Sequence, residues 1–395
     1  MSHVMNTYAR QPVAFVRGEG VWLWDEAGKK YLDALAGIAV NTLGYAHPKF
    51  LKAINDRVKS GVIHTSNLFR IPDQEAAADR VAEITGLDEV FFCNSGLEAN
   101  ECAIKVARKY GHDRGIAEPA IIVMEKAFHG RSLATLSATG SRKVQAGFEP
   151  LVQGFVRVPL NDLEAVRVVA ANNRNVSAVL IEPIQGEGGI NVSRLEYLRG
   201  LKQVCDESGW LFISDEVQCG MGRSGKWFIY QHAGFQPDVV ALAKGLASGV
   251  PVGACVVGNR AKGVFKPGNH GSTFGGNPLA MTAVVTTIDT VKEENLMERA
   301  VKVGDAIRGG IGDALKGHSG VSDIRGMGSM IGVELKEPCG ELVKHALDAG
   351  LVINVTADSV VRLLPPLVMK EAEARQVVER LVPLVKAFLD KRAAA

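Results

Sequence analysis

The chain has 395 residues, 47 % of them hydrophobic and 22 % charged, which is the composition of an ordinary folded protein with room for two or three domains or lobes. Lysine and arginine number 45 and aspartate and glutamate 43, so the formal net charge is +2 and gives no electrostatic reason to expect nucleic acid or an anionic membrane as a partner. No apolar run approaches the roughly 18–20 residues of a membrane span, and the N-terminus lacks the continuous apolar stretch of a signal peptide.

The six cysteines and nine histidines do not show the spacing of a metal site. There is no C-x-x-C or H-E-x-x-H pair, and most cysteines stand among apolar residues. We interpret the cysteines as buried thiols in a reducing compartment, so a cytoplasmic protein without a bound metal is expected.

The N-terminal part predicts a hairpin, because residues 21–24 and 30–32 flank a turn-like Asp-Glu-Ala-Gly sequence. From about residue 50, short apolar runs alternate with helix-length amphipathic stretches, which favours a mostly parallel sheet covered by helices. The predicted buried strands are 90–93, 121–124, 178–181, 211–213 and 239–243. Residues 252–257 follow too soon for a crossover helix and are expected to pair antiparallel with a neighbour.

Polar residues of different chemical types follow four of these runs. They are Asn94-Ser95-Gly96, Glu182, Asp215-Glu216 and Lys244. One such residue would be ordinary strand-end polarity. Because open α/β sheets bind ligands at the carboxyl ends of their strands, the four together predict a binding site at that edge.

After about residue 285 the strand signal weakens. We expect a long helix over 280–296 and then a smaller mixed region, whose last helix carries an apolar stripe from Val377 to Leu389. Pro383 interrupts this stripe, which costs about 3 kcal/mol or kinks the helix.

The sequence Ser95-Gly96-Leu97-Glu98 has two compatible interpretations. It is a capping box, in which Ser95 caps the following helix and Glu98 reaches back. The same helix N-terminus also offers free N–H groups to a phosphate, which Gly96 would allow to approach closely.

Residues 220–225 match G-x-G-x-x-G, and Gly225-Lys226 resembles the end of a P-loop. However, Trp227 stands where a P-loop has Ser or Thr, and the glycines do not directly follow a strand. We therefore favour a glycine-rich active-site loop over a nucleotide site.

Lys244 ends one apolar run and Asp215 ends the run before it. A lysine at a strand end usually extends to solvent, whereas burial lowers its pKa and favours a neutral amine that can attack an aldehyde. A buried aspartate needs a cationic or hydrogen-bonding partner, which a protonated pyridine nitrogen would supply. Aspartate with lysine is the pair that pyridoxal phosphate enzymes use.

Arg131 and Arg362 are candidate carboxylate clamps, because a guanidinium binds a carboxylate through two parallel hydrogen bonds. Arg131 follows Phe128-His129-Gly130, and Arg362 lies in an apolar stretch that is unusual for a surface charge. A surface salt bridge is the commoner role of a single arginine, and His129 is equally well explained as a structural hydrogen-bonding residue.

Seven motifs make the chain resemble the class III pyridoxal phosphate aminotransferases nearly from end to end. They are residues 41–48 (NTLGYAHP), 94–96 (NSG), 128–131 (FHGR), 182–189 (EPIQGEGG), 215–218 (DEVQ), 243–245 (AKG) and 271–278 (GSTFGGNP). Within the family, the length, residues 66–68 and residues 362–366 are most similar to acetylornithine aminotransferases. The resemblance implies an α/β fold, PLP-dependent transferase fold type I. Its mostly parallel seven-stranded sheet would lie in a large domain over 51–285, and residues 1–50 and 286–395 would form a small α+β domain.

The resemblance also implies pyridoxal 5′-phosphate as cofactor, covalently bound to Lys244. Lys244 would then move the proton of the substrate carbon, and Asp215 would pair with the ring nitrogen. The other implied cofactor-binding residues are Ser95, Gly96 and Leu97 at the phosphate, Phe128 and Val217 on the ring faces, Gln218 at the phenolic oxygen, and Glu216. Thr273 would complete the phosphate site of the other subunit, which implies a homodimer. Leu97 and Cys219 depart from the family pattern, and these changes bear on cofactor affinity rather than on the reaction.

The implied substrate-binding residues are Arg131, Glu187, Ser272 and Arg362. Arg131 would hold the α-carboxylate of the amino donor or the distal carboxylate of 2-oxoglutarate, and Arg362 the α-carboxylate of 2-oxoglutarate. Glu187 would neutralise Arg362 when the donor is bound, because an unpaired buried arginine is costly.

The implied activity is transfer of the δ-amino group of N2-acetyl-L-ornithine to 2-oxoglutarate in arginine biosynthesis. The alternatives are the same chemistry on succinylornithine, ornithine, N-succinyldiaminopimelate or 4-aminobutyrate. Alternatives of other classes are a P-loop-like nucleotide-binding protein and a non-catalytic pyridoxal phosphate-binding regulator.

Overall fold

The computed structural model describes residues 3–393. Its largest sheet has seven strands in the order β4, β12, β11, β10, β7, β5, β6. β12 pairs antiparallel with both neighbours, and all other pairs are parallel. The strands are β4 (Glu89–Cys93), β5 (Ala120–Met124), β6 (Phe155–Val158), β7 (Val176–Ile181), β10 (Leu211–Asp215), β11 (Val239–Leu242) and β12 (Gly253–Val257).

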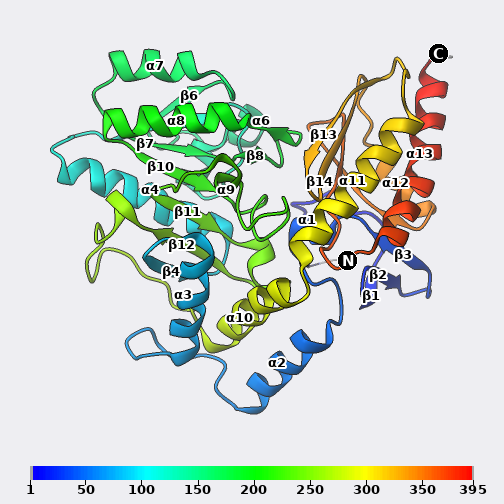
Figure 1. Ribbon diagram of the computed structural model, residues 1–395, viewed down its shortest axis with the longest axis horizontal. Helices are drawn as coiled ribbons and strands as arrows, with labels where there is room; N and C mark the ends of the chain where they lie inside the picture. The colour runs from blue at the N-terminus through cyan, green and yellow to red at the C-terminus, as the bar shows by residue number, and fades with distance from the viewer. Residues whose placement is uncertain (1–2, 394–395) are drawn as a thin grey trace.

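Helices cover both faces of this sheet (Figure 1), because neighbouring residues of a strand point to opposite faces and both are apolar here. Ile121 packs with α4 (Gly96–Asp113), whereas Ile122 packs with α7 (Leu163–Asn172) and α8 (Leu195–Ser208) on the other face. Two further helices, α3 (Pro72–Thr85) and α10 (Pro278–Glu293), pack on β11 and β12.

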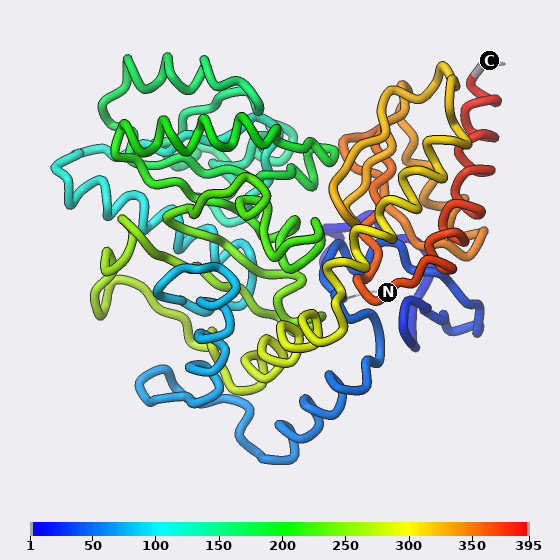
Figure 2. Tube along the Cα trace, viewed as in Figure 1, coloured from blue at the N-terminus to red at the C-terminus, as the bar shows by residue number. Residues whose placement is uncertain are grey.

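The N-terminal strands and the C-terminal residues share a second core. Val21 and Leu32 belong to the same apolar cluster as Ile307, Val361 and Leu381. Figure 2 shows the N-terminal strands beside the C-terminal segments, far from them in sequence. The elements of this part are β1 (Phe15–Glu19), β2 (Trp22–Asp25), β3 (Lys30–Asp33), α11 (Leu296–Ala314), β13 (Val321–Met327), β14 (Met330–Leu335), α12 (Leu342–Asp348), β15 (Leu351–Val352), β16 (Asn354–Thr356), β17 (Val360–Leu363) and α13 (Glu371–Ala393).

These strands form two four-stranded sheets, ordered β1-β2-β3-β15 and β13-β14-β17-β16. The remaining elements are α1 (Ala36–Ala39), α2 (Pro48–Lys59), α5 (Leu133–Ala138), α6 (Arg142–Gln145), β8 (Ile184–Gln185), β9 (Asn191–Val192), α9 (Ile229–Ala233) and 3₁₀ turns at Lys244–Leu246 and Asn259–Ala261. None of the helices within residues 3–393 combines the length and apolar character that a bilayer span requires.

The structure confirms the predicted hairpin, the five predicted strands and the antiparallel placement of residues 252–257. The edge strand β6 is absent from the prediction because it is only four residues long and contains the exposed Arg157. The predicted helix over 280–296 is wrong at its end, since α10 stops at Glu293 and Asn295, with a φ of 52°, separates it from α11. Five strands, β13 to β17, follow residue 285, where the apolar pattern predicted none individually. The last predicted helix is present as α13, and it continues through Pro383.

A left-handed turn leads from the N-terminal strands to the carboxyl edge of the large sheet. The four residues of α1 have φ values of 51°, 63°, 68° and 62°, and three of them are not glycine. Asp33 supports the turn, because its Oδ1 accepts the N–H groups of Leu35 (2.8 Å) and Ala36 (3.0 Å). Such backbone persists only where the surrounding structure holds it, and here it brings Val40 to a cavity.

Candidate active site

A cavity of about 390 Å³ lies at the carboxyl edge of the large sheet. The sequence-predicted site residues that line it are Ser95, Gly96, Leu97, Phe128, Arg131, Asp215, Val217, Gln218 and Lys244. The structure therefore brings together residues from the ends of four strands, β4, β5, β10 and β11. Glu182, which the strand-end pattern also predicted, lines the cavity too. The cavity lining further includes Asn100, His129, Val40 and residues 249–252, which are absent from the predicted site.

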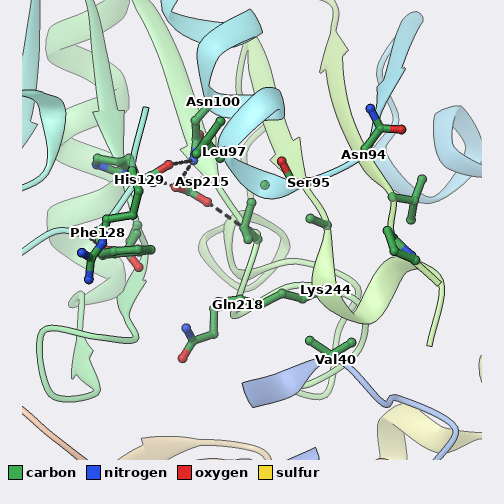
Figure 3. Close-up of a pocket in the computed structure, with 18 of the residues that line it drawn as sticks. Val40, Asn94, Ser95, Leu97, Asn100, Phe128, His129, Asp215, Gln218 and Lys244 are labelled. Carbon is green, nitrogen blue, oxygen red and sulfur yellow. Dashed lines mark hydrogen bonds and ion pairs between the residues drawn. The ribbon is translucent and has the colours of Figure 1, made fainter. Parts of the chain in front are cut away.

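Asp215 is fixed at the end of β10 by three hydrogen bonds (Figure 3). Its Oδ2 accepts from Asn100 Nδ2 at 2.7 Å and lies 2.7 Å from His129 Nδ1, and its Oδ1 accepts the Val217 N–H at 3.1 Å. The side chain is buried. A carboxylate can accept about four hydrogen bonds, so one acceptor position remains for a donor in the cavity.

His129 and Asn100 are therefore the main site residues that sequence reasoning missed. Each could have been found from a weak signal: His129 lies within the Phe-His-Gly-Arg motif, and Asn100 lies one helical turn after Gly96. Neither signal specifies Asp215 as the partner, because β10 lies far from both in sequence.

Lys244 follows β11 with a φ of 43°, a left-handed conformation that is strained for a lysine. The side chain is half-buried and borders the cavity. Burial lowers the pKa of its amine, and this effect outweighs the opposing attraction of the Glu187 carboxylate. The lowered pKa favours the neutral, nucleophilic amine.

The N-terminus of α4 lines the cavity next to the loop that follows β10. Ser95 caps this helix, since its Oγ accepts the Glu98 N–H at 3.2 Å, so the predicted cap is confirmed. The Glu98 carboxylate accepts the Asn94 N–H and not that of Ser95, so the full capping box is not formed. The first-turn amides of Gly96 and Leu97 have no intrahelical acceptor and can bind an anion. A Cβ on Gly96 would lie 2.6 Å from Val217 Cγ1, which explains why a glycine stands here.

Arg362 and Glu187 form an ion pair beside the cavity. Arg362 Nη1 lies 2.6 Å from Glu187 Oε1 and donates to Gln218 Oε1 at 3.1 Å, and Arg362 Nε donates to Asn354 Oδ1 at 3.1 Å. The arginine side chain is fully buried, whereas that of Glu187 is 35 % exposed. Burial alone would raise the pKa of Glu187, but the Arg362 guanidinium holds it below its usual value.

Five predicted residues do not line this cavity: Arg362 and Glu187, which lie beside it, and Ser272, Thr273 and Glu216. Ser272 and Thr273 line a neighbouring hollow of about 340 Å³, which shares Asn94 with it. Glu216 points elsewhere, because its Oε1 accepts the Ile229 N–H at 2.8 Å. Burial raises the pKa of Glu216 to about 7.

The glycine-rich loop at 220–225 is explained by packing rather than by phosphate binding. A Cβ on Gly222 would lie 3.0 Å from Met297 Cγ, and one on Gly225 would lie 2.4 Å from Val301 Cγ2. The Lys226 ammonium donates to the Gln231 carbonyl at 3.1 Å. These contacts to α11 and α9 argue against the nucleotide-binding alternative.

The donor set of the cavity suits pyridoxal phosphate. Free helix amides offer a phosphate site, a carboxylate keeps one acceptor position for a ring N–H, and an amine of lowered pKa borders the same cavity. Within residues 3–393, no three histidine, cysteine, aspartate or glutamate side chains are placed to hold a metal ion.

Residues 4–385 match the family described as aminotransferase class-III. The chain belongs to this family. It is therefore a pyridoxal phosphate-dependent aminotransferase, and its α/β architecture is fold type I.

Curated relatives and solved structures agree with this assignment. Acetylornithine aminotransferase of Nitrosomonas europaea is 58 % identical over 392 residues, which cover 99 % of this chain and all of that protein. The structure of ornithine aminotransferase from Toxoplasma gondii has a TM-score of 0.94 at 32 % identity and covers 98 % of this chain and 94 % of that one. Acetylornithine aminotransferase from Elizabethkingia anophelis has a TM-score of 0.88 at 35 % identity, over 98 % and 96 %.

Proposed function

We propose that the enzyme transfers the δ-amino group of N2-acetyl-L-ornithine to 2-oxoglutarate, giving N-acetyl-L-glutamate 5-semialdehyde and L-glutamate, in arginine biosynthesis. The observation that carries the proposal is the 58 % identity to an acetylornithine aminotransferase along essentially the whole chain. The ion pair of the buried Arg362 with Glu187 supports it. The amino donor and 2-oxoglutarate bind in turn and differ in their number of carboxylates, so a cation that can be neutralised is needed.

When bound, pyridoxal phosphate supplies an aldehyde and an electron-accepting ring. We assign its covalent attachment to Lys244, whose low-pKa amine is the only one bordering the cavity among the described residues. The same Nζ is suited to take up and return a proton at the substrate carbon, because burial lowers its pKa.

The cavity walls would orient the cofactor. Asp215, held by His129 and Asn100, would accept the ring N–H, and the α4 amides after Ser95 would bind the phosphate. The ring would lie between Phe128 and Val217, with Gln218 at its phenolic oxygen, which fits their places in the cavity lining.

The substrate carboxylates would bind at two arginines. Arg131 is exposed, with its guanidinium 5.7 Å from the Phe128 ring centroid, so it is free to bind the donor α-carboxylate or the distal carboxylate of 2-oxoglutarate. Arg362 would bind the α-carboxylate of 2-oxoglutarate after Glu187 moves away. Ser272 would also bind substrate, from the neighbouring hollow, where its Oγ accepts a hydrogen bond from Asn94 Nδ2.

We further propose a homodimer in which Thr273 completes the phosphate site of the other subunit, since Thr273 does not line the cavity of its own chain. We also propose two domains, a small one of residues 1–50 and 286–395 and a large one of residues 51–285. Residues 1–2 and 394–395 lie outside the described part.

We propose that the enzyme is cytoplasmic, because its six cysteines are buried and free, as is usual in a reducing compartment.

A spectral assay with a panel of amines tests the proposal. The purified enzyme should be yellow, its absorbance should bleach fastest with N2-acetylornithine, and 2-oxoglutarate should restore it. Faster bleaching with succinylornithine, ornithine, N-succinyldiaminopimelate or 4-aminobutyrate would replace the proposed donor. A yellow protein that bleaches with none of them would be a regulator, and stabilisation by ATP alone would favour a nucleotide-binding protein.

A further inference from the structure

Glu182 is a buried carboxylate of the cavity wall that no step described above uses. It follows β7 directly and is 4 % exposed. Its Oε2 accepts the Phe128 N–H at 2.7 Å, and its Oε1 accepts the Gly186 N–H at 3.3 Å. The two oxygens of one side chain therefore join two different loops.

The two loops lie side by side because β5 and β7 are neighbours in the sheet. Phe128 belongs to the loop after β5, and Gly186 directly precedes Glu187 in the loop after β7. Gln185 Nε2 also donates to the Glu125 carbonyl at 2.6 Å, and a Cβ on Gly188 would lie 2.5 Å from the Lys126 carbonyl oxygen. The contact between the loops is close along its length, with Glu182 at its buried end.

We propose that Glu182 is a positioning residue that holds Phe128 and the Glu187 carboxylate in one fixed arrangement. The inference rests on the proposed function, in which Phe128 covers a face of the cofactor ring and Glu187 neutralises Arg362. A carboxylate is required because both of its oxygens accept, whereas an amide in either orientation turns an NH₂ group toward one of the two backbone N–H groups. A buried N–H without an acceptor is costly, so that loop shifts to find one.

Two variants and one control test this role. Glu182→Gln keeps the shape but loses one acceptor, and Glu182→Asp keeps the charge but is too short to reach both loops. The control is Asp238→Asn. Asp238 is also buried and its Oδ2 also accepts a backbone N–H, from Phe212 at 2.9 Å, but it precedes β11 and lies at the opposite edge of the sheet.

The first readout is hydrogen–deuterium exchange of the cofactor-free protein, followed by mass spectrometry. In both Glu182 variants, peptides that contain Phe128 and Gly186 should exchange at least ten-fold faster than in the unmodified protein. The control should leave these peptides unchanged even if it lowers the melting temperature, which separates a positioning role from general destabilisation.

The second readout is cofactor and acceptor binding. The Glu182 variants should raise the dissociation constant of pyridoxal phosphate about ten-fold and change the KM for 2-oxoglutarate, and the control should do neither. Exchange rates and dissociation constants within two-fold of the unmodified protein in both variants would overturn the inference. If the unmodified protein failed to bind pyridoxal phosphate, the proposed function would fail, while the exchange experiment would still decide whether Glu182 joins the loops.

Discussion

Substitution of Glu187 by glutamine tests the ion pair on which the alternation between substrates depends. Arg362 is fully buried and 2.6 Å from the carboxylate, and the side chain of Glu187 is 35 % exposed. Two unit charges about 4 Å apart interact by about 4 kcal/mol at an effective dielectric constant near 20. Solvent at the exposed carboxylate weakens this, so we take about half, roughly 2 kcal/mol, which corresponds to about thirty-fold in an equilibrium constant.

The expected result is a change in the ratio of the two half-reactions. In the unmodified enzyme, 2-oxoglutarate must displace Glu187 from Arg362, whereas Glu187→Gln removes that competition. The kcat/KM of the 2-oxoglutarate half-reaction relative to that of the amine half-reaction should therefore rise about thirty-fold.

Stopped-flow measurement of each half-reaction, from the cofactor absorbance, provides the ratio directly. Glu125→Gln is the matched control, because Glu125 is an exposed glutamate on the neighbouring loop and should leave the ratio unchanged. Equal effects of Glu187→Gln on both half-reactions would refute the reasoning, since a general loss of activity does not distinguish the substrates.

Three further predictions follow from the geometry. Lys244→Ala should abolish turnover and leave pyridoxal phosphate bound only non-covalently, so no cofactor adduct should remain in the mass spectrum of the borohydride-treated protein; full activity would remove Lys244 from its role. Arg131→Ala should raise KM for both donor and acceptor by roughly ten- to hundred-fold, because a charge-assisted hydrogen bond worth about 1.5–3 kcal/mol is lost. Unchanged kinetics would exclude Arg131 from the site. Glu216 has a folded-state pKa of about 7 against an ordinary value of 4.5, so the stability it contributes is fully present below about pH 4.5 and is lost as the pH rises towards 7. Glu216→Gln should therefore gain about 2.5 kcal/mol relative to the unmodified, cofactor-free protein between pH 5 and pH 8, measured by guanidinium unfolding; a difference independent of pH would contradict the buried carboxyl's shift.

Most strands of the large sheet, and the chemical types at its carboxyl edge, could be predicted from the amino-acid sequence. Five apolar runs predicted five strands, because residues buried on both faces of a sheet must be apolar whatever they contact. The residues after those runs, including Asp215 and Lys244, must therefore lie near one another, because the carboxyl ends of parallel strands share one edge of the sheet.

The pairing of side chains could not be predicted, because it depends on how distant elements pack. Arg362 meets Glu187 across 175 residues, and Asp215 meets Asn100 across 115. Hydrophobic periodicity reports which face of a local element is buried, but it carries no information on which distant element covers that face. The pairing of Arg362 with Glu187, the joining of two loops by Glu182 and the left-handed turn before Val40 all arise from that packing.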